Sequence, residues 1–231
     1  MAAIYYADDE QDIRERVSAW LKSDGHEVTA FETGDALLTA FRERPCDLVI
    51  LDIMMPGTDG IGILTALRRE SRVPVILLTA KDTDSDYYTG LTLGSDDYIT
   101  KPFKPMLLSA RVKALLRRVE MDSGAPGRSA PVITCGNLRY TPGKNLFEVS
   151  GRELRLTPTE LKYLAHMMAH LGENVSRNDL LDAVWGMNFE VETRVVDETN
   201  RRLRRKLNEA GADVTLETVW GFGFKLTERN A

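Results

Sequence analysis

Five short apolar runs, separated by stretches with helical periodicity, fill the first 119 residues, and this alternation restricts the fold more than any other feature of the 231-residue chain. Parallel strands need long crossover connections, usually helices, whereas antiparallel strands need only short turns. Five strands that alternate with helices therefore predict an α/β domain with a doubly wound, flavodoxin-like parallel sheet covered on both faces. Ligands of such sheets bind at the carboxyl ends of the strands. The expected strands are IYYA, HEVTAF, DLVILD, PVILLTA and DYIT.

A different pattern follows the first domain. The stretch MDSGAPGRSAP, at 121–131, is rich in Gly, Ser, Ala and Pro and lacks apolar periodicity, which is typical of a linker. Beyond it the sequence predicts several short strands, a final hairpin and, between them, three helices at 158–170, 177–185 and about 191–209. This order predicts an α+β winged helix-turn-helix domain. The expected division is a first domain at 1–119, a linker at 120–131 and a second domain at 132–231.

Charge is distributed unevenly along the chain, whose net charge is −5. Residues 1–120 carry 20 acidic and 15 basic side chains, whereas residues 131–231 carry 14 of each. A neutral second half that contains one concentrated basic run has a local electrostatic footprint rather than a general one. Because the sequence shows neither an apolar run of transmembrane length nor a signal-like start, we expect a cytoplasmic protein with no membrane partner.

Three carboxylates fall at the ends of two predicted strands. Asp8 and Asp9 follow the first strand, and Asp52 ends the third. If these strands are neighbours, the carboxylates converge and repel one another, and each tends to take up a proton. A divalent cation removes that repulsion, and a site made only of oxygen ligands suits Mg²⁺ or Mn²⁺.

Two further polar side chains, Thr79 and Lys101, also end predicted strands. A hydroxyl, a fixed cation and a metal ion together match the oxygens of a phosphoryl group. We therefore expect Asp52 to act as a nucleophile that forms an aspartyl phosphate. From the residues alone, a magnesium-dependent phosphotransferase with an Asp nucleophile is an alternative.

The stretch RVVDETNRRLRRKL, at 194–207, contains five basic residues within the six positions from Arg201 to Lys206. At about 100° per residue, one stripe of this helix holds Val196, Asn200, Leu203 and Leu207, and the opposite face holds Arg194, Glu198, Arg201, Arg202 and Arg205. Arginine pairs bidentately with guanine and with phosphates, so the helix is expected to bind double-stranded DNA. A helix that is merely solvated is disfavoured, because no acidic residue interrupts the sequence between Glu198 and Glu209.

The segments ADDE, ILDIMMPGTDG, VILLTAKD and GSDDYITKPF resemble the receiver domain of two-component response regulators. The segments RVVD and RLRRKL resemble the effector domain of the OmpR/PhoB subfamily. The resemblance implies that Asp52 accepts a phosphoryl group from a sensor histidine kinase and that Lys101 contacts the phosphate. It implies a switch pair made by Thr79 and Tyr98, and a metal site made by Asp8, Asp9, Asp52 and the backbone carbonyl of Met54. That Met54 stands two residues after Asp52, where phosphotransferases with an Asp nucleophile usually have a second Asp, weakens the enzyme alternative.

For the second domain, the resemblance implies that the basic helix enters a major groove and that the hairpin turn, with Phe222, lies along a minor groove. The loop from Trp185 to Glu190 is implied to face RNA polymerase. The implied DNA contacts are Arg194, Glu198, Thr199, Arg201, Arg202, Arg204, Arg205 and Phe222.

Two residues of the basic helix depart from the family pattern. Glu198 faces the DNA side, where it could accept a hydrogen bond from a cytosine amine or clamp Arg202 one turn further on; we favour the clamp. Asn200 replaces a usual Ile within the buried stripe, and we expect its amide to hydrogen-bond the backbone of a neighbouring helix or strand, since a buried unpartnered amide costs roughly 1–3 kcal/mol.

The resemblance also implies a homodimer formed through the fourth helix, fifth strand and fifth helix of the receiver. Asp97 and Arg111 match the ionic pattern of that face, whereas Tyr87, Thr89 and Leu107 replace charged residues. We therefore expect a regulator of transcription that is not an enzyme beyond its own phosphorylation and dephosphorylation, and that dimerises on direct-repeat DNA half-sites when phosphorylated. The alternative is a constitutive dimer that binds DNA without phosphorylation.

Overall fold

The computed structural model describes residues 1–80, 94–123, 131–186 and 194–229. The chain forms two compact units, Met1–Leu116 and Arg117–Ala231. Within the described residues, no helix has the length and apolar character needed to cross a membrane.

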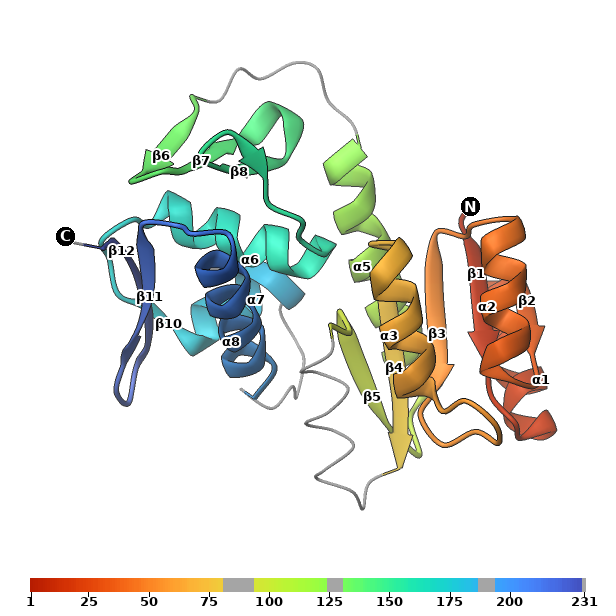
Figure 1. Ribbon diagram of the computed structural model, residues 1–231. Helices are drawn as coiled ribbons and strands as arrows, with labels where there is room; N and C mark the ends of the chain where they lie inside the picture. Colours follow the sequence, from red (N-terminus) through yellow and green to blue (C-terminus); the bar gives the residue numbers. More distant parts are fainter. Residues whose placement is uncertain (81–93, 124–130, 187–193, 230–231) are drawn as a thin grey trace. The chain divides into compact units, whose positions relative to one another are not determined.

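The first unit is built on a five-stranded parallel sheet in the order β2-β1-β3-β4-β5 (Figure 1). Its strands are β1 (Ala3–Ala7), β2 (Glu27–Phe31), β3 (Leu48–Asp52), β4 (Val75–Ala80) and β5 (Asp97–Lys101). Its described helices are α1 (Gln11–Ser23), α2 (Gly34–Glu43), α3 (Gly60–Glu70) and α5 (Pro105–Ser123). The predicted doubly wound sheet is confirmed, although α5 is longer than expected and includes residues 120–123, which the sequence assigned to the linker.

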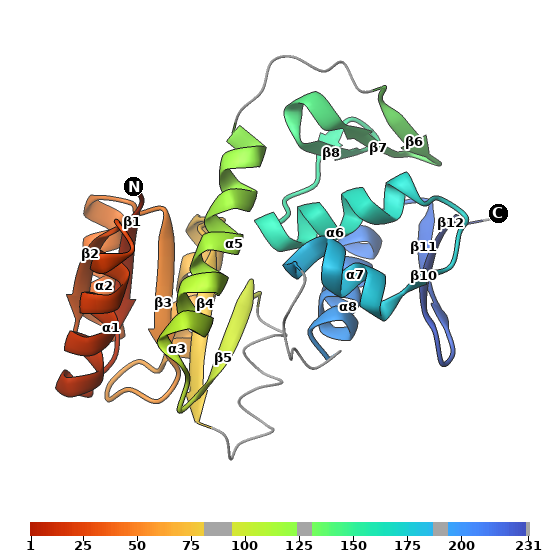
Figure 2. The same ribbon diagram turned by 180° about the vertical axis from the view of Figure 1, so that it is seen from behind.

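Both faces of this sheet are buried. One core cluster contains Leu37 and Phe41 of α2 with Ile63 of α3, and the other contains Val17 of α1 with Val112 of α5. Figures 1 and 2 show the two pairs of helices on opposite sides of the sheet. Since β3 has helices on both sides, all five of its residues, LVILD, are buried, as is typical of a central parallel strand.

The strand register brings the polar strand ends to one edge of the sheet. Ala7 pairs with Leu51, Asp52 with Leu78 and Ala80 with Lys101, so β1, β3, β4 and β5 end side by side. Gly60 begins α3 so close to this edge that an added Cβ would lie 2.1 Å from the backbone oxygen of Asp52. Only glycine fits there without displacing backbone.

The second unit takes in the end of α5 and continues with an antiparallel sheet in the order β6-β7-β8-β9 (Ile133–Cys135, Leu138–Thr141, Leu146–Val149 and Arg152–Glu153). Three helices follow: α6 (Pro158–Ala169), α7 (Arg177–Trp185) and α8 (Arg194–Glu209). A second sheet, β10-β12-β11, contains β10 (Val175–Ser176), β11 (Val214–Val219) and β12 (Gly223–Glu228). The predicted winged helix architecture is confirmed. Strand β10 was not predicted, because two residues are too short to show a pattern.

Local chemistry explains where these helices and the hairpin begin and end. Capping boxes start α6, through Thr157 and Glu160, and α7, through Ser176 and Asp179. At the start of β12, a Cβ on Gly223 would lie 2.0 Å from the backbone oxygen of Val175. Glycine is therefore required where β10 meets the hairpin.

Candidate functional site

The three predicted carboxylates meet at the carboxyl edge of the parallel sheet. One ligand oxygen from each of Asp8, Asp9 and Asp52 lies within 4.8 Å of the others. Asp8 is 0% and Asp52 4% exposed, whereas Asp9 is open to solvent. They converge because β1 and β3 are neighbours in the sheet.

Lys101 lies in the same pocket. Its Nζ donates to Oδ2 of Asp52 at 2.7 Å and to Oδ2 of Asp8 at 2.9 Å. Lys101 ends β5 and precedes a cis peptide bond to Pro102. The structure thus brings together four of the residues predicted for a phosphoryl-transfer site.

The pocket holds more negative charge than its lysine can balance. Burial raises the pKa of Asp52; Lys101 opposes this rise, and the charge of Asp8 adds to it. Burial by itself lowers the pKa of Lys101, but its hydrogen bonds to Asp52 and Asp8 outweigh that effect and raise it. A set of oxygen donors that retains net negative charge fits a small divalent cation such as Mg²⁺ or Mn²⁺.

Tyr6 is a polar contributor to this pocket that the sequence reasoning missed. Its hydroxyl donates to Oδ2 of Asp8 at 2.6 Å, and burial together with this bond raises the pKa of the phenol. The backbone N–H of Glu10 donates to Oδ1 of Asp8 at 3.0 Å. The sequence did contain a signal for this contact. Side chains alternate between the two faces of a strand, so Tyr6 and Asp8 point to the same side of an extended segment.

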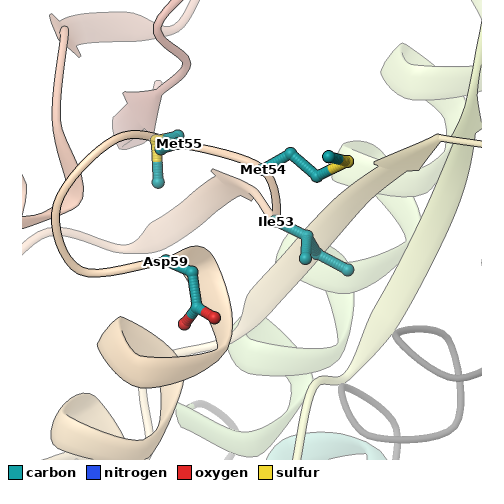
Figure 3. Close-up of a pocket in the computed structure, with 4 residues that line it drawn as sticks. All are labelled: Ile53, Met54, Met55 and Asp59. Atoms are coloured by element: carbon teal, nitrogen blue, oxygen red, sulfur yellow. The ribbon is translucent and has the colours of Figure 1, made fainter.

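The loop after β3 forms one wall of the site. Figure 3 shows Ile53, Met54 and Met55 around a hollow whose far side is Asp59, at the start of α3. The Asp59 side chain caps α3 by accepting from the N–H of Gly62 at 2.7 Å. Met54, whose carbonyl is a predicted metal ligand, is 59% exposed.

The predicted switch pair lies on neighbouring strands. Thr79, on β4, is buried and pairs with Thr100, whereas Tyr98, on β5, is half-buried against the core on the α2–α3 side. Residues 81–93 lie outside the described residues. The switching role of this pair stays a prediction.

One finding changes the role expected of two residues on the predicted dimer face. Asp97 and Arg111, expected to supply ionic contacts to a partner, bind each other within the chain at 3.1 Å, and only 4% and 6% of their side chains is exposed. They pair because β5 and α5 are packed against one another, which brings the two groups together. Leu107 is half-buried against the α1–α5 core. Tyr87 and Thr89 lie outside the described residues.

The buried stripe of α8 agrees with the sequence prediction. Val196, Leu203 and Leu207 are at most 2% exposed, and Asn200 is 1% exposed. The side-chain Oδ1 of Asn200 accepts a hydrogen bond from the hydroxyl of Tyr163, on α6, at 3.3 Å. The amide is therefore buried and partnered as expected, but its partner is a side chain and not the predicted backbone.

The basic face of α8 differs from its prediction. Arg202 is 3% exposed, donates to Oγ1 of Thr199 at 3.2 Å, and has its Nε 3.7 Å from Oε1 of Glu160; Thr199 is buried too. Placing Arg202 on the exposed face was wrong, because a long side chain on the flank of a helix can reach a buried carboxylate.

Two more members of the basic run have internal partners. Lys206 Nζ lies 2.5 Å from Oε2 of Glu160, and Arg204 donates to the backbone oxygen of Leu216 and, at 2.9 Å, to Oγ1 of Thr218. Arg201 and Arg205 remain exposed. The side chain of Arg194 lies outside the described part of the chain.

Glu198 does form a clamp, but with a different arginine. Its carboxylate accepts from Nε and Nη2 of Arg201 at 2.7–3.1 Å. The expected partner, Arg202, was wrong because the buried Glu160 and Thr199 attract it to the other side of α8. Residues three and four apart are both neighbours on a helix, so the clamp moves to the i,i+3 pair.

The tip of the β11–β12 hairpin carries two exposed aromatic side chains. Phe222, a predicted DNA contact, is 47% exposed, and Trp220 is 91% exposed. Gly221 between them has a φ of +71°, which sharpens the turn. Trp220 was missed, although a tryptophan next to a glycine in a predicted turn is a recognisable signal for an exposed aromatic.

Both halves of the chain match known families. Residues 4–113 match the response regulator receiver domain, and residues 151–226 match the C-terminal domain of transcriptional regulatory proteins. The transcriptional regulatory protein CseB of Streptomyces avermitilis is 40% identical over 96% of this chain and 97% of its own. The phosphate regulon regulator PhoB of Pseudomonas aeruginosa is 38% identical over 98% of both chains.

Solved structures agree with these matches. Response regulator DrrB of Thermotoga maritima, an OmpR/PhoB homologue, is 30% identical, with a TM-score of 0.52 over 98% of this chain and 99% of its own. A mutant of RitR has a TM-score of 0.78 over 99% of this chain and 100% of its own, at 24% identity, which supports the fold alone. Two matched domains and relatives that cover nearly the whole chain show that this protein belongs to the OmpR/PhoB family of two-component response regulators, transcription regulators in which a receiver domain is joined to a winged-helix DNA-binding domain.

Proposed function

We propose that this protein is a phosphorylation-switched regulator of transcription whose phosphoacceptor is Asp52. The observation that carries the proposal is the position of the Asp52 carboxylate, buried at a strand end, 2.7 Å from Lys101 and beside Asp8 and Asp9. A sensor histidine kinase is the phosphoryl donor. The receiver catalyses only its own phosphorylation and dephosphorylation, so the protein is not an enzyme with an external product.

In this reaction an Asp52 oxygen attacks the phosphorus while the bond from phosphorus to the histidine nitrogen breaks. Lys101 then turns from Asp52 Oδ2 to a phosphoryl oxygen, which keeps its ammonium paired. The cation, Mg²⁺ or Mn²⁺, is held by Asp8, Asp9, Asp52 and the carbonyl of Met54, and when bound it neutralises phosphoryl charge. Thr79 and Tyr98 respond to the phosphoryl group as the switch pair.

The DNA contacts proposed here are fewer than the sequence indicated. Internal partners remove Arg202, Arg204 and Thr199 from the set. What remains on α8 is Arg201 with its Glu198 clamp, Arg205 and Arg194, together with Phe222 and Trp220 at the wing. We further propose a cytoplasmic protein that binds direct-repeat half-sites as a homodimer and contacts RNA polymerase through residues 185–190, of which 187–190 lie outside the described residues.

A constitutive dimer is the second candidate. It is favoured by the sequence of the dimer face, where Tyr87, Thr89 and Leu107 replace charged residues; the internal ion pair between Asp97 and Arg111 takes two further charges away from intermolecular contacts. Light scattering in Mg²⁺, with and without beryllofluoride as a phosphoryl mimic, separates the two candidates. A monomer that dimerises only with the mimic supports the switch, whereas a dimer in both conditions supports the second candidate.

Phosphorylation itself is tested by incubating the protein with acetyl phosphate and Mg²⁺ and separating the products on a phosphate-affinity gel. The wild type should shift and Asp52→Asn should not. Asp12→Asn is a matched control, because Asp12 is exposed on α1 and its ion pair with Arg16 is long and open to solvent. A shifted band for Asp52→Asn contradicts the proposed phosphoacceptor.

A further inference from the structure

The Tyr6 hydroxyl is fixed where it meets the acidic pocket. Tyr6 is 0% exposed, and its ring belongs to the core cluster that includes Val17, Leu21 and Ile50. A ring packed on all sides holds its hydroxyl in one place, so the 2.6 Å bond to Oδ2 of Asp8 has a rigid donor. Because β1 ends at Ala7, this donor comes from the strand itself and not from a loop.

The hydrogen bonds to Asp8 limit how it can bind a cation. An ionised carboxylate offers about four lone-pair sites, two on each oxygen. On Oδ2 both are engaged, by the hydroxyl of Tyr6 and by Nζ of Lys101. On Oδ1 one is engaged, by the N–H of Glu10. The remaining lone pair belongs to Oδ1, so Asp8 is arranged to give a cation a single oxygen.

Tyr6 is the more permanent of the two donors on Oδ2. In the proposed reaction Lys101 turns from Asp52 toward the phosphoryl group, whereas the Tyr6 hydroxyl is fixed by its packed ring and stays on Oδ2. Ligating carboxylates are usually oriented by such outer hydrogen bonds. A carboxylate that loses them can rotate and offer both oxygens, which suits the larger and more flexible coordination of Ca²⁺ better than the octahedral coordination of Mg²⁺.

We propose that Tyr6 is a positioning residue of the cation site, which holds Asp8 so that only Oδ1 is offered and thereby favours Mg²⁺ over Ca²⁺. The inference rests on the proposed function, because it assumes that the acidic pocket binds a divalent cation.

The test compares two tyrosines that are adjacent in β1. Tyr6→Phe removes the hydroxyl that meets Asp8, and Tyr5→Phe removes a hydroxyl that donates to the backbone oxygen of Arg44 at 2.9 Å, on the other core cluster. Binding of MgCl₂ and of CaCl₂ to the full chain is measured by calorimetry without a phosphoryl donor. For Tyr6→Phe we expect the Mg²⁺ dissociation constant to rise about 10-fold or more and the Ca²⁺ constant to change less. Tyr5→Phe should bind both ions as the wild type does.

The outcomes separate the inference from the function on which it rests. A wild type that binds no Mg²⁺ contradicts the proposed metal site. A wild type that binds Mg²⁺ while Tyr6→Phe keeps the same affinity and the same Mg²⁺/Ca²⁺ ratio overturns the role of Tyr6 alone. If circular dichroism shows that Tyr6→Phe does not fold, 3-fluorotyrosine is placed at position 6 of the otherwise unchanged chain. Its ¹⁹F signal must then move on addition of MgCl₂, and a signal that stays in place overturns the inference.

Discussion

The acidic pocket and the basic helix α8 are both clusters of like charge, but the fold treats them differently. In the pocket, Lys101 is the cation that faces Asp8 and Asp52, and Asp9 stays exposed. In α8, by contrast, three of the five basic side chains from 201 to 206 are held by partners on other elements of their own unit: Arg202 and Lys206 by Glu160 of α6, and Arg204 by β11. A like-charge cluster therefore indicates a binding site only after the opposite charges of the same unit have been assigned.

The first prediction concerns Glu160, whose carboxylate is the partner of both Arg202 and Lys206. Burial by itself raises the pKa of Glu160, but the charges of Arg202 and Lys206 outweigh it and keep that pKa below its usual value. Glu160→Gln leaves both cations in a buried site without a countercharge, which costs about 3–5 kcal/mol. Urea unfolding of the full chain should show this loss in the transition of the second unit. Glu173→Gln, at an exposed position, is the control and should change little.

The pH dependence of that loss checks its cause. A carboxyl group with a lowered pKa in the folded state contributes stability above its unfolded pKa and loses it as pH falls through the folded pKa. The difference between wild type and Glu160→Gln should therefore shrink as the pH is lowered through that range. A difference that is constant with pH assigns the loss to packing or capping and not to charge.

The contrast between the two regions also explains what the sequence could predict. Asp8, Asp52 and Lys101 follow apolar runs, and parallel register aligns strand ends, so their meeting required only the strand order. Arg202 has four flexible side-chain torsions, and its partner Glu160 lies 42 positions earlier, in another helix. A helical projection contains no information on such a partner, because it represents one helix in isolation. Tyr6 was missed for a related reason: in a strand it reads as a core residue, and only its hydroxyl belongs to the site.

The second prediction separates basic residues that stabilise from those that are free to bind DNA. Arg204→Ala removes hydrogen bonds to Leu216 and Thr218 and a contact over the ring of Phe224, so we expect a loss of roughly 1.5–3 kcal/mol in unfolding free energy. Among the described residues, Arg205→Ala removes a long, exposed ion pair to Glu209, and it should leave stability nearly unchanged. In DNA titrations at several salt concentrations, Arg205→Ala should weaken binding and lower the salt slope by about one. Equal stability losses in the two variants contradict the assignment of Arg204 to stability and of Arg205 to DNA binding.

The third prediction concerns the cost of the acidic pocket to the metal-free protein. Because burial raises the pKa of Asp52, the folded state binds its proton more tightly than the unfolded state, and stability falls as pH rises from the ordinary aspartate value through the raised one. Asp52→Asn should therefore stabilise the chain at neutral pH in EDTA, and this gain should vanish at acidic pH. Since Lys101 offsets part of the cost, we expect a smaller change than for Glu160→Gln. Unfolding free energies across pH measure it, and a destabilised Asp52→Asn at neutral pH contradicts it.

The smallest effect on stability is expected from removing the clamp between Glu198 and Arg201. The Arg201 side chain is 61% exposed, which screens its charge, and that of Glu198 is 12% exposed; because glutamine can still accept a hydrogen bond from Arg201, Glu198→Gln should cost less than about 1 kcal/mol of unfolding free energy. Its effect on DNA should be larger in selectivity than in affinity. The carboxylate fixes the direction of the Arg201 guanidinium, and removing a negative charge from this face strengthens attraction to every phosphate alike.

Selection of binding sequences from a randomised half-site measures this effect. For Glu198→Gln we expect a weaker preference at one base pair, where the free energy of discrimination between bases is about 1–3 kcal/mol, and tighter binding to non-specific DNA. Arg201→Lys is the companion variant, because it keeps the charge and loses the bidentate clamp. If neither variant changes the selected sequence, the pair between Glu198 and Arg201 belongs with the internal partners of α8, and the proposed DNA contacts reduce to Arg205, the wing and, from the sequence alone, Arg194.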